Sequence, residues 1–324
     1  MKKLLALILA TLMLLSLTAC DSETSPNNNN DPTQNESNNQ EDGNNTSDDT
    51  KTDNSKTDDS ESSKDTVDEK KNEISFTGLV AVDNEECTIK VTEIDPDNIW
   101  GYTLKVQLEN KSDDKTYMFS VESAAINGVQ CDPFFATEVA ANKKANKEII
   151  FAGNELKENG VKDYTDIELS FRVYDSNDWT AEAVAKATIH VYPYGESKAA
   201  KYERLPQESD TIIIDNEYVT VIVTCYEDDS IWGYTANLFL LNKTEKNVMF
   251  SVDDASINGY MADPFFAKSV SAGKCAFGSM SWSDTMLEEN GIVAVEEIEF
   301  NMRAYNEDDW LADDFANEVI TLNP

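Results

Sequence analysis

The sequence predicts an all-β fold that is present in two tandem copies. Three observations support this prediction: an internal duplication, runs in which apolar and polar residues alternate, and turn-forming residues between those runs. Alternation with a period of two indicates strands that place one face in a core and the other in solvent. A helical pattern covers only Asn154 to Asn159, a single turn that Gly160 ends.

The duplication consists of motifs that recur in the same order. Ile99-Trp100-Gly101-Tyr102-Thr103 returns as Ile231-Trp232-Gly233-Tyr234-Thr235, and Asp132-Pro133-Phe134-Phe135-Ala136 returns as Asp263-Pro264-Phe265-Phe266-Ala267. Because the order is kept from end to end, one ancestral domain has been copied whole. The predicted parts are a signal peptide (1–19), a disordered acidic tether (20–73), a first repeat (74–193), a linker (194–210) and a second repeat (211–324).

Within the first repeat, the clearest strands are predicted over 102–108 and 167–173. Further strands are expected near 75–82, 87–94, 116–127, 146–152 and 184–192. About seven short strands in a domain of this length are typical of an immunoglobulin-like β-sandwich. The Cys…Trp…Cys spacing of antibody domains is absent, so the prediction concerns architecture.

The two repeats resemble the immunoglobulin-like domains of unknown function that occur in lipoproteins of Gram-positive bacteria. The resemblance rests on Asn110-Lys111-Ser112 and Asn242-Lys243-Thr244, on Asn258-Gly259-Tyr260 and on Ala272-Gly273-Lys274. The first repeat departs from it, with Val129 for the tyrosine and Asn142 for the glycine, and the second ends Arg303-Ala304-Tyr305-Asn306 where the family has a final aspartate. The resemblance implies a fold and a cell-surface location, and no activity.

The first residues have the pattern of an export signal. Lys2 and Lys3 precede an apolar run over 4–17, which is shorter than the roughly 20 residues that span a bilayer. The run ends at Leu17-Thr18-Ala19-Cys20, which resembles the lipobox of bacterial lipoproteins. That resemblance implies a diacylglyceryl group on Cys20, and two acyl chains are enough for stable anchoring at the outer face of the cell membrane.

Charge and composition narrow the possible partners. The chain has 62 acidic and 26 basic residues, a net charge of −36, and such a field repels nucleic acid and anionic lipid headgroups. From Asp21 to Glu73 there is almost no apolar residue besides Val67, so we expect a flexible spacer. Membrane contact is therefore expected through the lipid, and nucleic-acid binding is not expected.

Residues that could support catalysis are few. Cys87, Cys131, Cys225 and Cys275 occupy non-equivalent positions in the two repeats, which favours free and mostly buried thiols and leaves disulfide pairing open. His190 is the only histidine and is expected to be structural. Neither a catalytic triad nor a glycine-rich phosphate loop is present, so we expect a non-enzyme without cofactor or metal. A carboxylate-based hydrolase is the least favoured alternative.

The acidic loops 175–178 and 306–309 group oxygen ligands before a tryptophan. They lack the glycine and the distal glutamate of an EF-hand, so we expect solvated turn acids, although calcium binding stays open. The tryptophans themselves recur in pairs, Trp100 with Trp232 and Trp179 with Trp310. We expect them to be buried at the ends of the sandwich cores.

One strand face differs between the repeats. Outward Lys105, Gln107 and Glu109 of the first repeat are replaced by Asn237, Phe239 and Leu241 in the second. Apolar side chains on a solvated face need a cover, either the first repeat folded back across the linker or an external partner. Two further segments are expected to border this face: a late strand with Arg303 and Tyr305, and the loop after Pro264 with Phe265 and Phe266. The predicted interaction surface therefore comprises Phe239, Leu241, Phe265, Phe266, Arg303 and Tyr305.

These features favour a lipid-anchored cell-surface protein that binds or adheres to an extracellular ligand or an envelope partner. The partner could be another protein or a cell-wall polymer. A structural or regulatory accessory of an envelope complex is the alternative, because the apolar face could equally serve contacts inside the chain.

Overall fold

The structure is a computed structural model that describes residues 73–153 and 155–324. The predicted signal peptide, Cys20 and the predicted tether up to residue 72 lie outside the described residues. All described residues belong to one compact unit. None of the helices in this part of the chain is long and apolar enough to cross a membrane.

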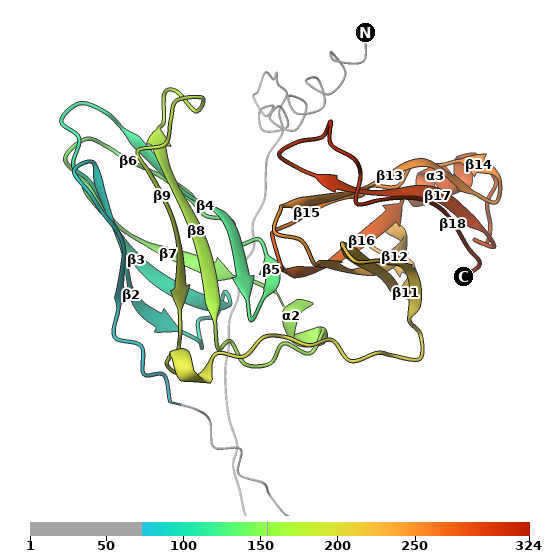
Figure 1. The fold of residues 1–324 in the computed structure, drawn as a ribbon, viewed down its shortest axis with the longest axis horizontal. Coiled ribbons are helices and arrows are strands. Elements are labelled where there is room, and N and C mark those ends of the chain that lie inside the picture. The colour runs from blue at the N-terminus through green and yellow to red at the C-terminus, as the bar shows by residue number, and fades with distance from the viewer. Residues whose placement is uncertain (1–72, 154) are drawn as a thin grey trace, which may run out of the picture. The chain divides into compact units, whose positions relative to one another are not determined.

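The first repeat is a sandwich of two β-sheets (Figure 1). One sheet has the order β1 (Leu79–Asp83), β2 (Cys87–Asp95), β3 (Tyr102–Asn110) and β7 (Lys144–Phe151). The other has the order β5 (Val129–Cys131), β4 (Tyr117–Ile126), β8 (Ile167–Asp175) and β9 (Ala185–Val191), with β6 (Ala136–Val139) also paired to β4. The single helical turn α2 (Glu155–Glu158) leads from β7 towards β8.

The second repeat builds the same elements in the same order. Its first sheet contains β10 (Thr211–Asp215), β11 (Val219–Ser230), β12 (Gly233–Asn242) and β16 (Cys275–Trp282). Its second sheet contains β14 (Tyr260–Met261), β13 (Val248–Ile257), β17 (Ile298–Asn306) and β18 (Ala316–Leu322), with β15 (Ala267–Val270) on β13. The helix α3 (Asp284–Glu289) follows β16, and a 3-10 turn, η1 (Glu196–Lys198), lies between the repeats.

The all-β sandwich predicted from the alternating pattern is confirmed. The pairing of β2 with β3 in one sheet separates this strand order from that of immunoglobulin constant domains, where the second and third strands lie in opposite sheets. The core follows from the alternation: Leu104, Val106 and Leu108 are at most 1% exposed and face the interior between the two sheets. Burying each such side chain stabilises the fold by roughly 1.5–3 kcal/mol.

The Asn-Lys turn that recurs in both repeats has a structural role. The Asn110 side chain is buried and its Nδ2 donates to the carbonyl oxygens of Lys115 and Val139, both at 2.8 Å. The Asn242 side chain closes the equivalent turn of the second repeat in the same way. A buried amide that satisfies backbone carbonyls fixes the chain where it crosses between the sheets.

One sheet continues from the first repeat into the second. Strand β5 pairs in parallel with β16, with Val129 opposite Cys275, so the sheet order is β10-β11-β12-β16-β5-β4-β8-β9. The side chain of Gln130 extends this contact, because its Nε2 donates to the Ser269 carbonyl oxygen and its Oε1 accepts from the Ser271 amide, both at 2.7 Å.

Candidate functional site

The four loop tryptophans are exposed, so the prediction that they are buried is wrong. The exposed fractions are 68% for Trp100, 71% for Trp232, 73% for Trp179 and 64% for Trp310. The first two follow β2 and β11, and the last two follow β8 and β17, so each pair holds equivalent positions. An exposed indole adds nothing to a core, whereas tryptophan is enriched where proteins contact other molecules.

The backbone of the loop explains why Trp232 points outward. A Cβ atom on Gly233 would lie 2.2 Å from the carbonyl oxygen of Trp282, so only glycine lets the chain pass so close to β16. Ser230 holds the loop, because its Oγ accepts from the Trp232 amide at 3.1 Å and donates to the Gly233 carbonyl oxygen at 2.7 Å. The tryptophan that packs in the core of the second repeat is Trp282, which is 1% exposed.

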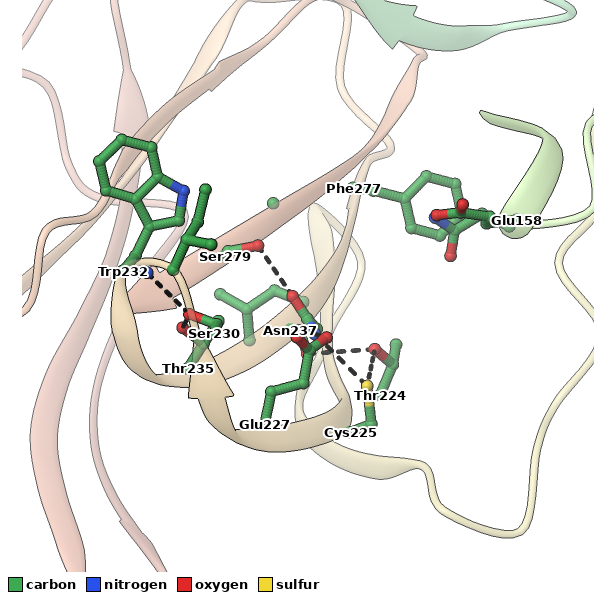
Figure 2. Close-up of a pocket in the computed structure, with 14 residues that line it drawn as sticks. Glu158, Thr224, Cys225, Glu227, Ser230, Trp232, Thr235, Asn237, Phe277 and Ser279 are labelled. Carbon is green, nitrogen blue, oxygen red and sulfur yellow. Dashed lines mark hydrogen bonds between the residues drawn. The ribbon is translucent and has the colours of Figure 1, made fainter. Parts of the chain in front are cut away.

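A groove of about 640 Å³ lies beside Trp232 on the outer face of β11, β12 and β16 (Figure 2). It is lined by Thr224, Cys225, Glu227, Ser230, Ile231, Trp232, Thr235, Asn237, Leu238, Phe277, Gly278 and Ser279, together with Glu158 and Asn159 from the first repeat. This volume lies within the roughly 300–1,000 Å³ typical of small-molecule sites.

Polar side chains on the floor of this groove hold one another in place (Figure 2). Asn237 Nδ2 donates to Glu227 Oε1 at 2.5 Å and to Cys225 Sγ at 3.4 Å. Asn237 Oδ1 accepts from Ser279 Oγ at 2.8 Å. The amide is therefore oriented from both sides before any ligand is present, which lowers the ordering cost of binding.

The first repeat carries charges where the second has this groove. Lys105 stands at the position of Asn237, and its Nζ forms an ion pair with Glu93 at 2.8 Å. The hydrogen bond from Glu93 raises the pKa of Lys105 above its ordinary value. This face is therefore ionic, whereas the groove floor of the second repeat is made of neutral groups around one carboxylate.

A second groove, of about 540 Å³, lies beside Trp100. Its lining includes Phe134, Tyr164 and Leu156 of the first repeat and Lys268 of the second. It is the more apolar of the two grooves, and its polar lining includes the ion pair of Lys268 with Asp132 at 2.7 Å.

The two Phe-Phe motifs divide between solvent and core. Phe134 is 95% exposed while Phe135 is buried, and Phe265 is 78% exposed while Phe266 is half-buried against the second core. Neighbours in extended chain point in opposite directions, which explains why one ring of each pair is exposed and the other is covered.

Phe239 and Leu241 are covered from within the chain. Phe239 is 6% exposed and belongs, with Phe277, to the core cluster of the first repeat, against which Leu241 also packs. The linker completes the cover, because the Arg204 guanidinium lies 5.5 Å from the centre of the Phe239 ring and Tyr202 contacts Phe277 edge-on. Of the two covers considered for this face, the structure places the first repeat and the linker over it.

Arg303 and Tyr305 do not border this face, and the prediction that their strand neighbours β12 is wrong. Their strand β17 pairs with β13 and β18 in the opposite sheet. Arg303 instead makes two 3.0 Å hydrogen bonds to Asp314 and stacks on Tyr305. The Arg303 guanidinium holds the pKa of Asp314 below its ordinary value.

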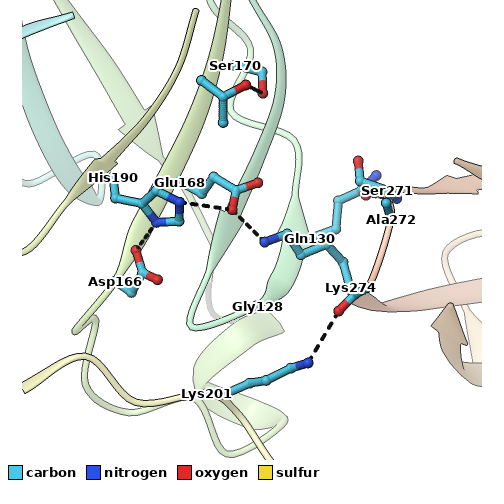
Figure 3. A network of polar contacts seen from close by, with 12 residues as sticks. Gly128, Gln130, Asp166, Glu168, Ser170, His190, Lys201, Ser271, Ala272 and Lys274 are labelled. Atoms are coloured by element: carbon cyan, nitrogen blue, oxygen red, sulfur yellow. Dashed lines mark hydrogen bonds and ion pairs between the residues drawn. The ribbon is translucent and has the colours of Figure 1, made fainter. Parts of the chain in front are cut away.

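His190 belongs to a polar network at the contact between the repeats (Figure 3). Its Nδ1 lies 2.7 Å from Asp166 Oδ1 and its Nε2 lies 3.5 Å from Glu168 Oε2. Glu168 also forms an ion pair with Lys274 of the second repeat at 2.5 Å. Through Glu168, this network links His190 of the first repeat to Lys274 of the second.

Two of the four thiols, those of Cys87 and Cys275, are buried. Burial raises the pKa of Cys87 and of Cys275 to about 11, so both are protonated at neutral pH and are poor nucleophiles. None of the four cysteines of the described chain is joined in a disulfide; Cys131 is half-buried and Cys225 is exposed. Within residues 73–153 and 155–324, no group of three or more His, Cys, Asp or Glu side chains could hold a metal ion.

Comparisons with known proteins give no family for this chain. Neither a protein-family model nor a curated protein matches it. Solved structures with weak likeness include a YadV chaperone (12% identity, 73% of this chain and 100% of that one, TM-score 0.23). Another is the exo-chitosanase CsxA of Amycolatopsis orientalis (11% identity, 74% of this chain and 27% of that one, TM-score 0.22). A third is a protein of unknown function from Porphyromonas gingivalis W83 (11% identity, 76% of this chain and 100% of that one, TM-score 0.20). Likeness at these TM-scores supports no functional argument.

Proposed function

We propose that this protein is a lipid-anchored binding protein of the cell surface, whose loop aromatics contact an extracellular ligand or an envelope partner. The observation that carries the proposal is the exposure of all four loop tryptophans at positions that are equivalent in the two repeats. An anchor on Cys20 and an acidic spacer complete the proposal, and both rest on the sequence alone.

The geometry favours binding over catalysis. The grooves beside Trp100 and Trp232 are open, and each combines an aromatic ring with fixed polar groups. Two carboxylates line the Trp232 groove, Glu227 and Glu158 of the first repeat. Glu227 accepts a hydrogen bond from the Asn237 amide, which ties it into the groove floor.

A second candidate is an accessory role inside an envelope complex. The contact of Phe239 and Phe277 with the first repeat favours it, because the apolar face then serves internal docking. This candidate predicts docked repeats and no ligand for the aromatic loops.

Binding to purified cell-wall sacculi tests the proposal. The full chain is incubated with sacculi and sedimented, and the same is done with a variant in which Trp100, Trp179, Trp232 and Trp310 are all replaced by alanine. We expect the wild type to co-sediment and the variant to stay in solution with an unchanged melting temperature. Equal behaviour of the two proteins would contradict the proposal and favour the accessory role.

A further inference from the structure

We infer that the groove beside Trp232 is a binding site for a neutral oligosaccharide. This inference rests on the proposed binding function and deepens it, because it names one site and one class of ligand. Four features of the groove support it: an exposed ring at the rim, polar groups on the floor, a lining without cations, and a different surface at the same place in the first repeat.

The rim of the groove offers a flat, exposed ring on a fixed loop. Trp232 is 71% exposed and its neighbour Ile231 is 91% exposed, while Ser230 and Gly233 fix the backbone between them and β16. The C–H face of a sugar ring can stack on an indole by dispersion and by removing apolar surface from water. A preformed platform loses little entropy when it does so.

The floor of the groove offers paired donors and acceptors. Asn237 presents an amide, Ser279 a hydroxyl and Glu227 a carboxylate, and hydrogen bonds at 2.5–2.8 Å hold the three in a row (Figure 2). Because the hydrogen atoms of the Asn237 amide and the Ser279 hydroxyl are used within the row, the row offers acceptor positions on Ser279 Oγ, Asn237 Oδ1 and the Glu227 carboxylate, to which sugar hydroxyls can donate. Groups of this kind set the orientation of a ligand whose apolar face lies on the ring.

The charge of the lining selects against anionic ligands. The described residues of the lining include the carboxylates Glu158 and Glu227 and no Lys, Arg or His, so an anionic polymer would be repelled. A cationic peptide would be attracted by the two carboxylates, whereas the amide, hydroxyl and aromatic groups of the lining match a neutral saccharide. A neutral saccharide is not repelled by the lining.

The first repeat shows what the same fold looks like without the site. Lys105 and Glu93 stand at the positions of Asn237 and Cys225, and Glu148 stands at that of Ser279. Their ion pair covers the floor with charges that a neutral ligand would have to desolvate. The groove is therefore a feature of the second repeat alone.

Isothermal titration calorimetry on the full chain in mild detergent tests the inference. The probes are neutral tetrasaccharides of glucose, N-acetylglucosamine, mannose and galactose, with tetragalacturonate and tetralysine as charged comparisons. We expect at least one neutral probe to bind with a Kd in the range of about 10 µM to 1 mM. Trp232→Ala and Asn237→Ala should each weaken that binding at least tenfold, and Lys105→Ala, the matched position of the first repeat, should leave it unchanged.

The outcomes separate this inference from the proposed function. Absence of binding by every neutral probe, binding of tetralysine alone, or neutral binding that Trp232→Ala does not weaken each overturns the oligosaccharide site. Circular dichroism and melting temperature verify that the variants are folded. If the four-tryptophan variant still loses sacculus binding in such a case, the proposed function stands and only this site is wrong.

Discussion

The outer faces of the first sheets in the two repeats are built from equivalent strands but carry different side chains, charged in the first repeat and largely apolar in the second. In the first repeat, β3 and β7 display Lys105, Gln107, Glu109 and Lys144, with ion pairs from Lys105 to Glu93 and from Lys144 to Glu109. In the second, β12 and β16 display Asn237, Phe239, Leu241 and Phe277. Duplication supplied two equal faces, and substitution made one of them a docking surface and a groove while the other stayed solvated.

The edges of these sheets differ in the same way. Strand β16 receives β5 of the first repeat along its edge, whereas β7 is the last strand of its sheet and carries Lys144, Lys147 and Glu148. Charged side chains on an open edge discourage pairing with another chain. The edge of β7 is therefore poorly suited to receive another strand.

The largest expected effect comes from placing a charge in the docked face. Phe239→Lys should lower the free energy of unfolding by about 3–5 kcal/mol, because it removes a buried ring and strands an ammonium group against the first core. We expect calorimetry to show two unfolding transitions in place of one, as the repeats lose their contact.

Gln107→Lys is the matched control for this variant, since Gln107 holds the same strand position in the first repeat and is half-exposed. It should change stability by no more than about 0.5 kcal/mol. Similar losses in the two variants would show that the faces do not differ as described.

A smaller effect is expected for the ion pair that joins the repeats. Lys274 and Glu168 have side chains only 20% and 19% exposed, and Lys274→Ala leaves that carboxylate with His190 as its remaining ionic partner. We expect a loss of about 1–2 kcal/mol in urea unfolding. Lys143→Ala, at the equivalent and exposed position of the first repeat, should cost less than about 0.5 kcal/mol, and an equal cost would contradict this role.

The smallest effect is expected in the linker and depends on pH. Asp210 accepts hydrogen bonds from both terminal nitrogens of Arg204, which hold its pKa below the ordinary 3.8. A pKa that is lower in the folded than in the unfolded state adds to the free energy of unfolding at pH values above the ordinary pKa. This added stability is lost as the pH falls through the depressed pKa. Asp210→Asn should therefore be about 1 kcal/mol less stable than the wild type at pH 7.

As the pH falls below 3.8 towards the depressed pKa of Asp210, the difference between wild type and Asp210→Asn should shrink, because the unfolded carboxyl is protonated before the folded one. Urea unfolding at several pH values between 3 and 7 measures this difference. A difference that stays constant over that range would show that the carboxylate charge plays no part in holding Arg204 over Phe239.

The strands that alternate over many residues could be predicted from the sequence, and the short ones could not. The period of two located β3 and β8, and the turn residues delimited them. Strands β5 and β6 have three and four residues and exist because β4 and β16 pair with them. Such strands leave no periodic signal, although β5 is the one that joins the repeats.

The site was only partly predictable for a related reason. The sequence identifies Phe239 and Leu241 as apolar residues in need of a cover, but it does not assign strands to sheets, so Arg303 and Tyr305 were placed beside the wrong strand. The exposure of Trp232 depends on the contact of Gly233 with β16, which is a tertiary approach. Two large apolar residues before a glycine in a turn, Ile231 and Trp232, are the signal that could have indicated it.

The parallel pairing of β5 with β16 also has a consequence for the order in which the chain is made. Synthesis proceeds from the N-terminus, so the first repeat leaves the ribosome before Cys275 and Phe277 exist. Until they arrive, Val129, which is fully buried in the finished fold, lies on an open strand edge. The first repeat on its own therefore has an unpaired edge at β5, which only the second repeat covers.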